Sequence, residues 1–305
     1  LSWRHLFGRL WREGGLLAML AALLVLLQLV DSFSTQLLLQ DAGLTAHQAE
    51  FTKGIYDRGQ PLVQLGMVLA TGLGTSLLPA LRQHVIRRDE QALRNDFQLT
   101  MRLSILLSGV ATVGLVAIMP SVNQLLFGSS AGSDALALFT ISIVPATLIV
   151  VSTSVLQSFD KTRGLGWFVL LTMLVKAGLN IWLVQIFGIA GASLATVGAL
   201  LPFLIFTLVR LPKSLWISWV PKKWWRKLIA ILLAVGILAR LAYILGHSLF
   251  GATRLASVLT TVVGAGVGAT AFVLMLWWTA LLEEAEWDAL PKGRQIYQFI
   301  NRGRK

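Results

Sequence analysis

The chain has 305 residues, of which 56% are hydrophobic and 13% are charged, and its formal net charge is +12. A mean hydropathy of +0.73 excludes an ordinary soluble domain, in which about a quarter of the residues are charged. The sequence has no cysteine and four scattered histidines, so we expect no disulfide and no metal site. We interpret the positive charge as that of loops that meet lipid headgroups, and we expect no nucleic-acid partner.

Long apolar runs follow one another along the chain, each close to the roughly 20 residues that a helix needs to cross a bilayer. The predicted fold class is therefore all-α, a polytopic membrane protein with about eight transmembrane helices, because a backbone in lipid must satisfy its own hydrogen bonds. The predicted spans, in chain order, are Gly15–Leu39, Pro61–Leu81, Gln98–Met119, Asp134–Leu156, Leu165–Phe187, Ala190–Val209, Leu228–Leu249 and Leu255–Leu282.

Basic residues gather in alternate connections between these spans. With a cytoplasmic N-terminus, most of the 26 lysines and arginines would lie in the cytoplasm, whereas Lys53, Arg58 and Arg254 would lie outside. By the positive-inside rule, this asymmetry places both termini in the cytoplasm and requires an even number of spans.

Two stretches near the C-terminal end are not predicted to span. Residues 211–227 read LPKSLWISWVPKKWWRK, and such a mixture of tryptophan and lysine is typical of a segment in the headgroup region. We expect an interfacial linker here, between residues 1–210 with six spans and residues 228–305 with two further spans. The stretch from Glu283 to Lys305 is expected to be a cytoplasmic tail.

Motifs of enzymatic chemistry are absent from the sequence. It contains no GxxxxGK[ST], HExxH or GxSxG pattern and no paired carboxylates on one predicted helix face. We therefore predict no catalytic residues, no bound metal and no cofactor, and a protein that is not an enzyme.

Polar side chains at membrane depth are the candidate binding residues, because a charge there costs about 2.5–3.5 kcal/mol on insertion scales and normally faces a cavity or a partner. Lys176 and Asn180 share one face of the fifth span. Gln28 and Asp31 share one face of the first, with Asp31 near its outer end, and Arg240 lies midway along the seventh. Two interpretations remain open, a hydrophilic cavity for an anionic substrate, or interhelical hydrogen bonds and snorkelling to the headgroups.

The segment Lys53–Pro61, KGIYDRGQP, is the most specific local feature of the sequence. Its proline suits the first turn of a helix. One interpretation is an exposed outer loop that caps the second span. The other places Arg58 at the outer mouth of a cavity, where it would contact a phosphate or a sugar.

Several stretches together carry a resemblance to a known family. The sequence resembles the SpoVB/YtgP-type polysaccharide biosynthesis proteins of the multidrug/oligosaccharidyl-lipid/polysaccharide exporter superfamily, which also contains the MurJ lipid II flippases. The residues that carry this resemblance are LVDSF (Leu29–Phe33), YDRGQPLVQLGMVLATGLGTSLLPAL (Tyr56–Leu81), LLFG (Leu125–Gly128), SDALAL (Ser133–Leu138) and FGIAGASLAT (Phe187–Thr196).

The resemblance implies a larger molecule than this chain. Family members have fourteen spans in two lobes, and eight spans with both ends inside look like helices 7–14 of that plan. Residues 1–210 would then belong to the C-terminal lobe, and the N-terminal lobe of the same protein would be a missing partner. The implied localisation is the bacterial cytoplasmic membrane.

The implied function is that of a flippase for an undecaprenyl-pyrophosphate-linked cell-envelope precursor, either lipid II or a polysaccharide repeat unit. Its partners would be the lipid-linked oligosaccharide and membrane lipids. Arg58 is the best-matched candidate contact, and Lys176 is inferred from its depth. Two alternatives stay open, a drug/cation antiporter of the same superfamily, which would need a carboxylate-lined cavity, and a membrane enzyme of envelope lipid assembly, which would need an acidic or histidine-containing outer loop.

Overall fold

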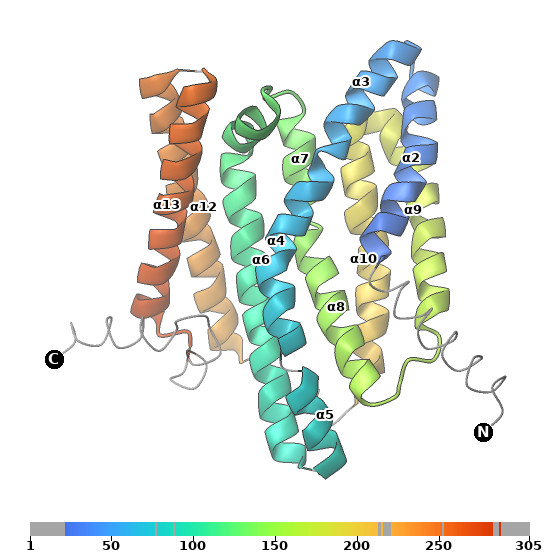
Figure 1. Ribbon diagram of the computed structural model, residues 1–305, viewed down its shortest axis with the longest axis vertical. Coiled ribbons are helices and arrows are strands. Elements are labelled where there is room, and N and C mark those ends of the chain that lie inside the picture. Colours follow the sequence, from blue (N-terminus) through green and yellow to red (C-terminus); the bar gives the residue numbers. More distant parts are fainter. Residues whose placement is uncertain are drawn as a thin grey trace. The chain divides into compact units, whose positions relative to one another are not determined.

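The computed structural model describes residues 22–76, 78–87, 89–212, 221–251 and 253–282, together with Leu215 and Trp287; for residues 69–71, 73–76 and 78–80 only the backbone is described. Every regular element in these ranges is a helix (Figure 1). The helices are α2 (Leu23–Asp41), α3 (Ala46–Asp57), α4 (Gly59–Ser76), α5 (Leu78–Arg87), α6 (Glu90–Phe127), α7 (Ser133–Thr140), α8 (Ile143–Ser158), α9 (Leu165–Phe187), α10 (Ile189–Arg210), α12 (Lys222–Phe250) and α13 (Arg254–Thr279).

Seven stretches of helix within the described residues are long and apolar enough to cross a membrane. They are α2, α6, the stretch Ser133–Ser158 that contains α7 and α8, and α9, α10, α12 and α13. The prediction of an all-α polytopic membrane protein is thereby confirmed. The predicted span Leu165–Phe187 has the same bounds as α9.

The second predicted span, Pro61–Leu81, is not among these seven. It falls on α4 and on the start of α5, which are described as Gly59–Ser76 and Leu78–Arg87. The residue between them, Leu77, lies outside the described residues, so the continuity of this span stays a prediction.

The expected exposed loop at Lys53–Pro61 is wrong, because this segment is almost entirely helical. A capping box of Thr45 and Gln48 starts α3, which continues to Asp57, and α4 begins at Gly59 after the single residue Arg58. Pro61 falls in the first turn of α4, as its missing N–H group favours. Tyr56 is buried and so faces the interior of the protein.

The chain forms two compact units that do not follow chain order. The first unit consists of Leu1–Leu65 and Asp134–Pro212, and the second consists of Gly66–Ser133 and Lys213–Lys305. The predicted division into residues 1–210, 211–227 and 228–305 concerns the lobes of a transporter and stays a prediction. Seven of the seventeen residues of the expected linker and nearly all of the expected tail lie outside the described residues. Lys222–Lys227 already forms the first turns of α12.

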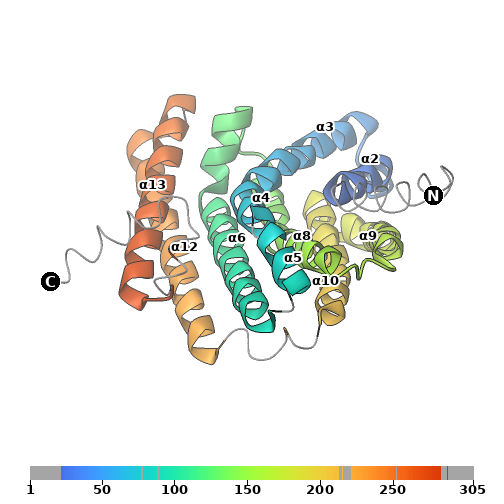
Figure 2. The ribbon, with the colours of Figure 1, turned by 60° about the horizontal axis from the view of Figure 1, so that its bottom comes forward.

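In the first unit, the hairpin of α9 and α10 packs against α2 and α8, and Figure 2 shows α9 beside α10. Gly188 joins the two helices with a φ of 58°, a left-handed conformation that favours glycine. One turn later, Gly191 lies directly against the backbone of Leu183 at the end of α9. The connection is therefore tight enough to hold the two helices in one register.

In the second unit, α12 and α13 form a hairpin that packs on α6. Small residues line these contacts. Gly109 of α6 lies under Leu232, Gly236 of α12 lies under Val113, and Gly264 of α13 lies close to Ile118. Helices in lipid associate through close van der Waals packing, because no apolar surface is removed from water there. Glycine at the contact is therefore expected, since it lets the two backbones approach closely.

The hairpin of the first unit gives a direct test. A methyl group at Gly191 would overlap the backbone carbonyl of Leu183, whereas nothing lies within 4 Å of a methyl group at Gly178 of α9. We expect Gly191→Ala to destabilise the protein by about 1–3 kcal/mol. Gly178→Ala should be neutral or slightly stabilising, because alanine favours helix by up to about 1 kcal/mol. Unfolding by sodium dodecyl sulfate in detergent micelles measures both. Equal stability of the two variants would contradict the tight hairpin.

Candidate functional site

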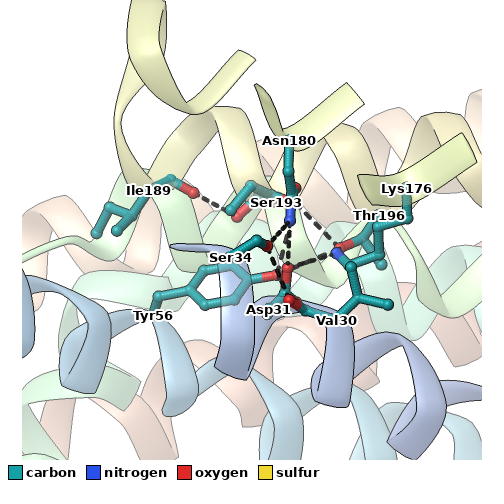
Figure 3. A network of polar contacts seen from close by, with 10 residues as sticks. Val30, Asp31, Ser34, Tyr56, Lys176, Asn180, Ile189, Ser193 and Thr196 are labelled. Carbon is teal, nitrogen blue, oxygen red and sulfur yellow. Dashed lines mark hydrogen bonds and ion pairs between the residues drawn. The ribbon is translucent and has the colours of Figure 1, made fainter. Parts of the chain in front are cut away.

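Buried polar residues from four helices meet inside the first unit (Figure 3). We call this group the Asp31–Lys176 cluster, and its members are Asp31 and Ser34 of α2, Tyr56 of α3, Lys176 and Asn180 of α9, and Thr196 of α10. All six belong to the same compact unit. Three of them, Asp31, Lys176 and Asn180, are among the residues predicted from the sequence.

An ion pair is the centre of the cluster. Lys176 Nζ lies 2.9 Å from Asp31 Oδ1, and the two side chains are 0% and 2% exposed. Lys176 also donates a hydrogen bond to Thr196 Oγ1, which in turn donates to the carbonyl of Ala192. The ammonium group thus has a carboxylate and a hydroxyl oxygen as partners, which is the compensation that a buried charge requires.

The carboxylate of Asp31 accepts from two further donors. Asn180 Nδ2 donates to Asp31 Oδ1 over 3.0 Å and to Ser34 Oγ over 2.9 Å. The hydroxyl of Tyr56 donates to Asp31 Oδ2 over 2.8 Å. Both oxygens of the carboxylate are therefore engaged, and two other helices, α3 and α9, hold Asp31 in place.

Tyr56 lies in α3, outside the seven candidate spans. Burial, together with the negative charge of Asp31, raises the pKa of Tyr56 well above its usual value. Its phenol is therefore neutral and serves as a donor to the carboxylate. The ring packs edge-on against Phe139 of α7, with ring centroids 5.3 Å apart, so the orientation of the hydroxyl is fixed by packing as well.

The cluster as a whole carries no net charge, since the ammonium of Lys176 balances the carboxylate of Asp31. In a medium of low dielectric constant, the two charges attract strongly, but each has lost its hydration. The structure shows Lys176 with its charge neutralised by Asp31, so an anionic ligand would have to compete with that carboxylate. This arrangement corresponds to the interhelical alternative that the sequence left open.

Asp31 belongs to α2, which ends at Asp41, two residues beyond the expected end of the first span at Leu39. Its predicted depth near the outer end of that span stays a prediction. Gln28 lies about one turn before Asp31 on the same helix and is half-buried. A role for either side chain in binding substrate stays a prediction.

The remaining two predicted residues are elsewhere. Arg58 is the C-cap of α3 and is half-buried. Arg240 belongs to the second unit, where its guanidinium donates to the carbonyl of Ala117 on α6 over 3.3 Å and lies 5.0 Å from the ring centroid of Tyr243. These contacts show what stabilises an arginine at that depth, and its contact with substrate stays a prediction.

Sequence reasoning missed Ser34, Tyr56 and Thr196 as members of the cluster. Each had a weak signal, because Ser34 lies one turn after Asp31, and Tyr56 and Thr196 fall in stretches that carry the family resemblance. No periodicity indicates that α3 and α10 face α2, so their meeting was not predictable. No group of three or more metal-ligating side chains occurs within the described part of the chain.

The fold and this cluster define a polytopic α-helical membrane protein with a compensated charge pair inside its helices. Residues 16–265 match the family model described as "Lipid II flippase MurJ". Because this match covers most of the chain, the protein belongs to that family.

One curated relative extends the comparison. The chain is 32% identical over 294 residues to the "Uncharacterized membrane protein YabM" of Bacillus subtilis (strain 168). The match covers 92% of this chain and 52% of the relative, so the chain spans about half the length of the curated relative that it matches.

The ion pair predicts a particular pattern of stabilities. We expect Lys176→Met or Asp31→Asn alone to cost about 3–5 kcal/mol, because each leaves the other charge buried without its partner. The double variant should cost clearly less than the sum of the two. A cycle of unfolding free energies in detergent micelles measures the coupling.

The matched control for this cycle is Lys53→Met, which breaks the 2.7 Å pair of Lys53 with Asp57. Those side chains are partly exposed and four residues apart on one helix, so the cost should stay below about 1 kcal/mol. If the stability costs of Lys176→Met and Asp31→Asn add to that of the double variant within about 0.5 kcal/mol, the two charges do not depend on each other.

Proposed function

We propose that this chain forms one half of a flippase that moves an undecaprenyl-pyrophosphate-linked cell-envelope precursor across the bacterial cytoplasmic membrane. The observation that carries the proposal is the match of residues 16–265 to the lipid II flippase family. Membership of that family favours a lipid-linked substrate over the antiporter and enzyme alternatives. The resemblance to SpoVB/YtgP-type proteins supports a polysaccharide repeat unit as the second candidate headgroup beside lipid II.

In this proposal, both termini lie in the cytoplasm and the chain acts together with an N-terminal lobe of the same protein. The share of the relative's length that the chain covers, 52%, supports a partner lobe of similar size. Transport then requires the two lobes to rock about a solvated cavity while the lipid tail stays in the bilayer. No covalent bond is broken, so the chain's residues have only to bind, orient and release the headgroup.

The charges of the chain divide into two proposed roles. Arg58 would neutralise the pyrophosphate, because guanidinium groups bind phosphate oxygens in a bidentate manner. A contact of Arg240 with the substrate is proposed separately, because Arg240 belongs to the other compact unit. Lys176 and Asn180 would instead hold α9 on α2 through Asp31. Lys176 would contact substrate only in a conformation in which Asp31 has another partner. Gln28 would line the same side of α2 as Asp31.

A complementation experiment tests the proposed function. The chain alone, and the chain joined to the N-terminal half of its Bacillus subtilis relative, are expressed in cells depleted of their lipid II flippase. We expect growth only with the joined protein, because the cavity needs both lobes. If neither protein supports growth although both are found in the membrane, lipid II is not the substrate and flipping of a polysaccharide repeat unit is measured next.

Arg58 gives a sharper test within the joined protein. We expect Arg58→Ala to reduce outward movement of labelled lipid-linked precursor at least tenfold while membrane abundance is unchanged, because one phosphate contact is worth about 1.5–3 kcal/mol. Arg58→Lys should restore part of the activity. The matched control is Arg82→Ala, at an exposed arginine of α5. Parallel loss of protein and transport in Arg58→Ala would mean that Arg58 stabilises the fold instead.

A further inference from the structure

The first two turns of α12 concentrate positive charge and tryptophan. Lys222, Lys223, Trp225 and Arg226 are all exposed there, and we call these four residues the basic collar. Trp224, between them, is buried and packs edge-on against Trp225 with ring centroids 5.4 Å apart. The indole of Trp225 is thus held on the surface by a second indole beneath it.

The charge of the basic collar is not compensated by the helix that carries it. The N-terminal end of a helix is electropositive and favours acidic side chains, yet the first turn of α12 contains none. Its N-cap, Pro221, supplies no side-chain hydrogen bond. Within the described residues, no ion pair involves Lys222, Lys223 or Arg226. Positive side chains and the helix end therefore add to one electropositive surface.

Lys227 differs from the residues of the basic collar because its ammonium group has a hydrogen-bond partner. Its ammonium donates to the carbonyl of Ala280, the C-cap of α13, over 3.0 Å. That bond joins the start of α12 to the end of α13, which lie side by side in Figure 1. It also brings the exposed indole of Trp278, near the end of α13, to the same end of the hairpin as the basic collar.

An apolar stripe continues from the basic collar along α12. Trp225, Ile229, Leu233 and Ile237 recur every four residues, so they lie on one face, and they are between 41% and 59% exposed. Side chains of this kind at the surface of a membrane protein contact acyl chains. Along α12, basic side chains thus come first, then an indole, and then aliphatic side chains. From the headgroups into a bilayer leaflet, membrane proteins place these side chains in the same order.

We propose that the basic collar binds the headgroup of an anionic phospholipid, whose acyl chains lie along the stripe below it. Charge complementarity selects the occupant, because the surface carries three exposed cations and a lipid-facing apolar path. Each lysine or arginine near an anionic membrane surface adds to the electrostatic attraction. This site is separate from the proposed transport function and does not depend on it.

The test compares lipid binding to the purified 305-residue chain by native mass spectrometry in detergent micelles doped with phosphatidylglycerol or phosphatidylcholine. We expect the K222Q/K223Q/R226Q variant to bind phosphatidylglycerol at least tenfold more weakly than the unmodified chain, with phosphatidylcholine binding unchanged. The matched control is R82Q/K161Q/R163Q, which removes three other exposed positive charges and should retain the affinity. Equal elution volume and helical content show that both variants are folded.

Three outcomes would overturn the proposal. One is equal weakening in both triple variants, which would mean that only the total charge matters. Another is an unmodified chain that binds both lipids equally. The third involves Glu283, Glu284 and Glu286, which follow α13 in the sequence. If E283Q/E284Q/E286Q creates a preference for phosphatidylglycerol that the unmodified chain lacks, these carboxylates occupy the basic collar instead of a lipid.

Discussion

The buried pair of Lys176 and Asp31 is the interaction on which the first unit depends. Neither charge is tolerable alone among apolar helices, and each is satisfied only when a second helix supplies its partner. Tyr56, Asn180 and Thr196 complete the hydrogen bonds of the pair. Four helices must therefore reach their final positions together, because a partly assembled cluster would leave a charge or a hydroxyl without a partner.

This constraint bears on how the proposed transport could work. A lipid-linked pyrophosphate is anionic, and the fully buried cation Lys176 is already neutralised by Asp31. In this proposal, the cluster holds α2, α3, α9 and α10 together so that they move as one rigid body. A rocking motion between lobes requires such rigid bodies. In this proposal, arginines outside the cluster contact the headgroup.

The second unit is held together by different means. Its hairpin of α12 and α13 packs on α6 through glycines. Close approach of the backbones thus takes the place of the buried ion pair and hydrogen bonds that join the helices of the first unit. Four basic residues of the second unit, Lys222, Lys223, Arg226 and Lys227, gather at the start of α12, where water and lipid headgroups can solvate them. The contrast explains why an uncompensated charge is tolerable at Lys222 but not at Lys176: depth in the membrane sets the cost of leaving it unpaired.

The sequence by itself determined the helical membrane fold, and it did so through local properties. The bounds of α9 follow from one apolar run that ends at Gly188, because hydropathy and helix ends are decided within a few residues. The helix α3 was missed because KGIYDRGQ contains charges and glycines that are typical of a loop, although Thr45 and Gln48 signal its start.

Only the tertiary structure decided which polar residues meet. The sequence indicated that Lys176 and Asn180 share a face and that Asp31 shares one with Gln28. It did not indicate that Asp31, Lys176 and Asn180 form one cluster with Tyr56 and Thr196. The physical reason is that transfer into the membrane depends on each segment alone. Pairing of charges depends on which faces of distant helices come together, and that is decided by the packing of the whole unit.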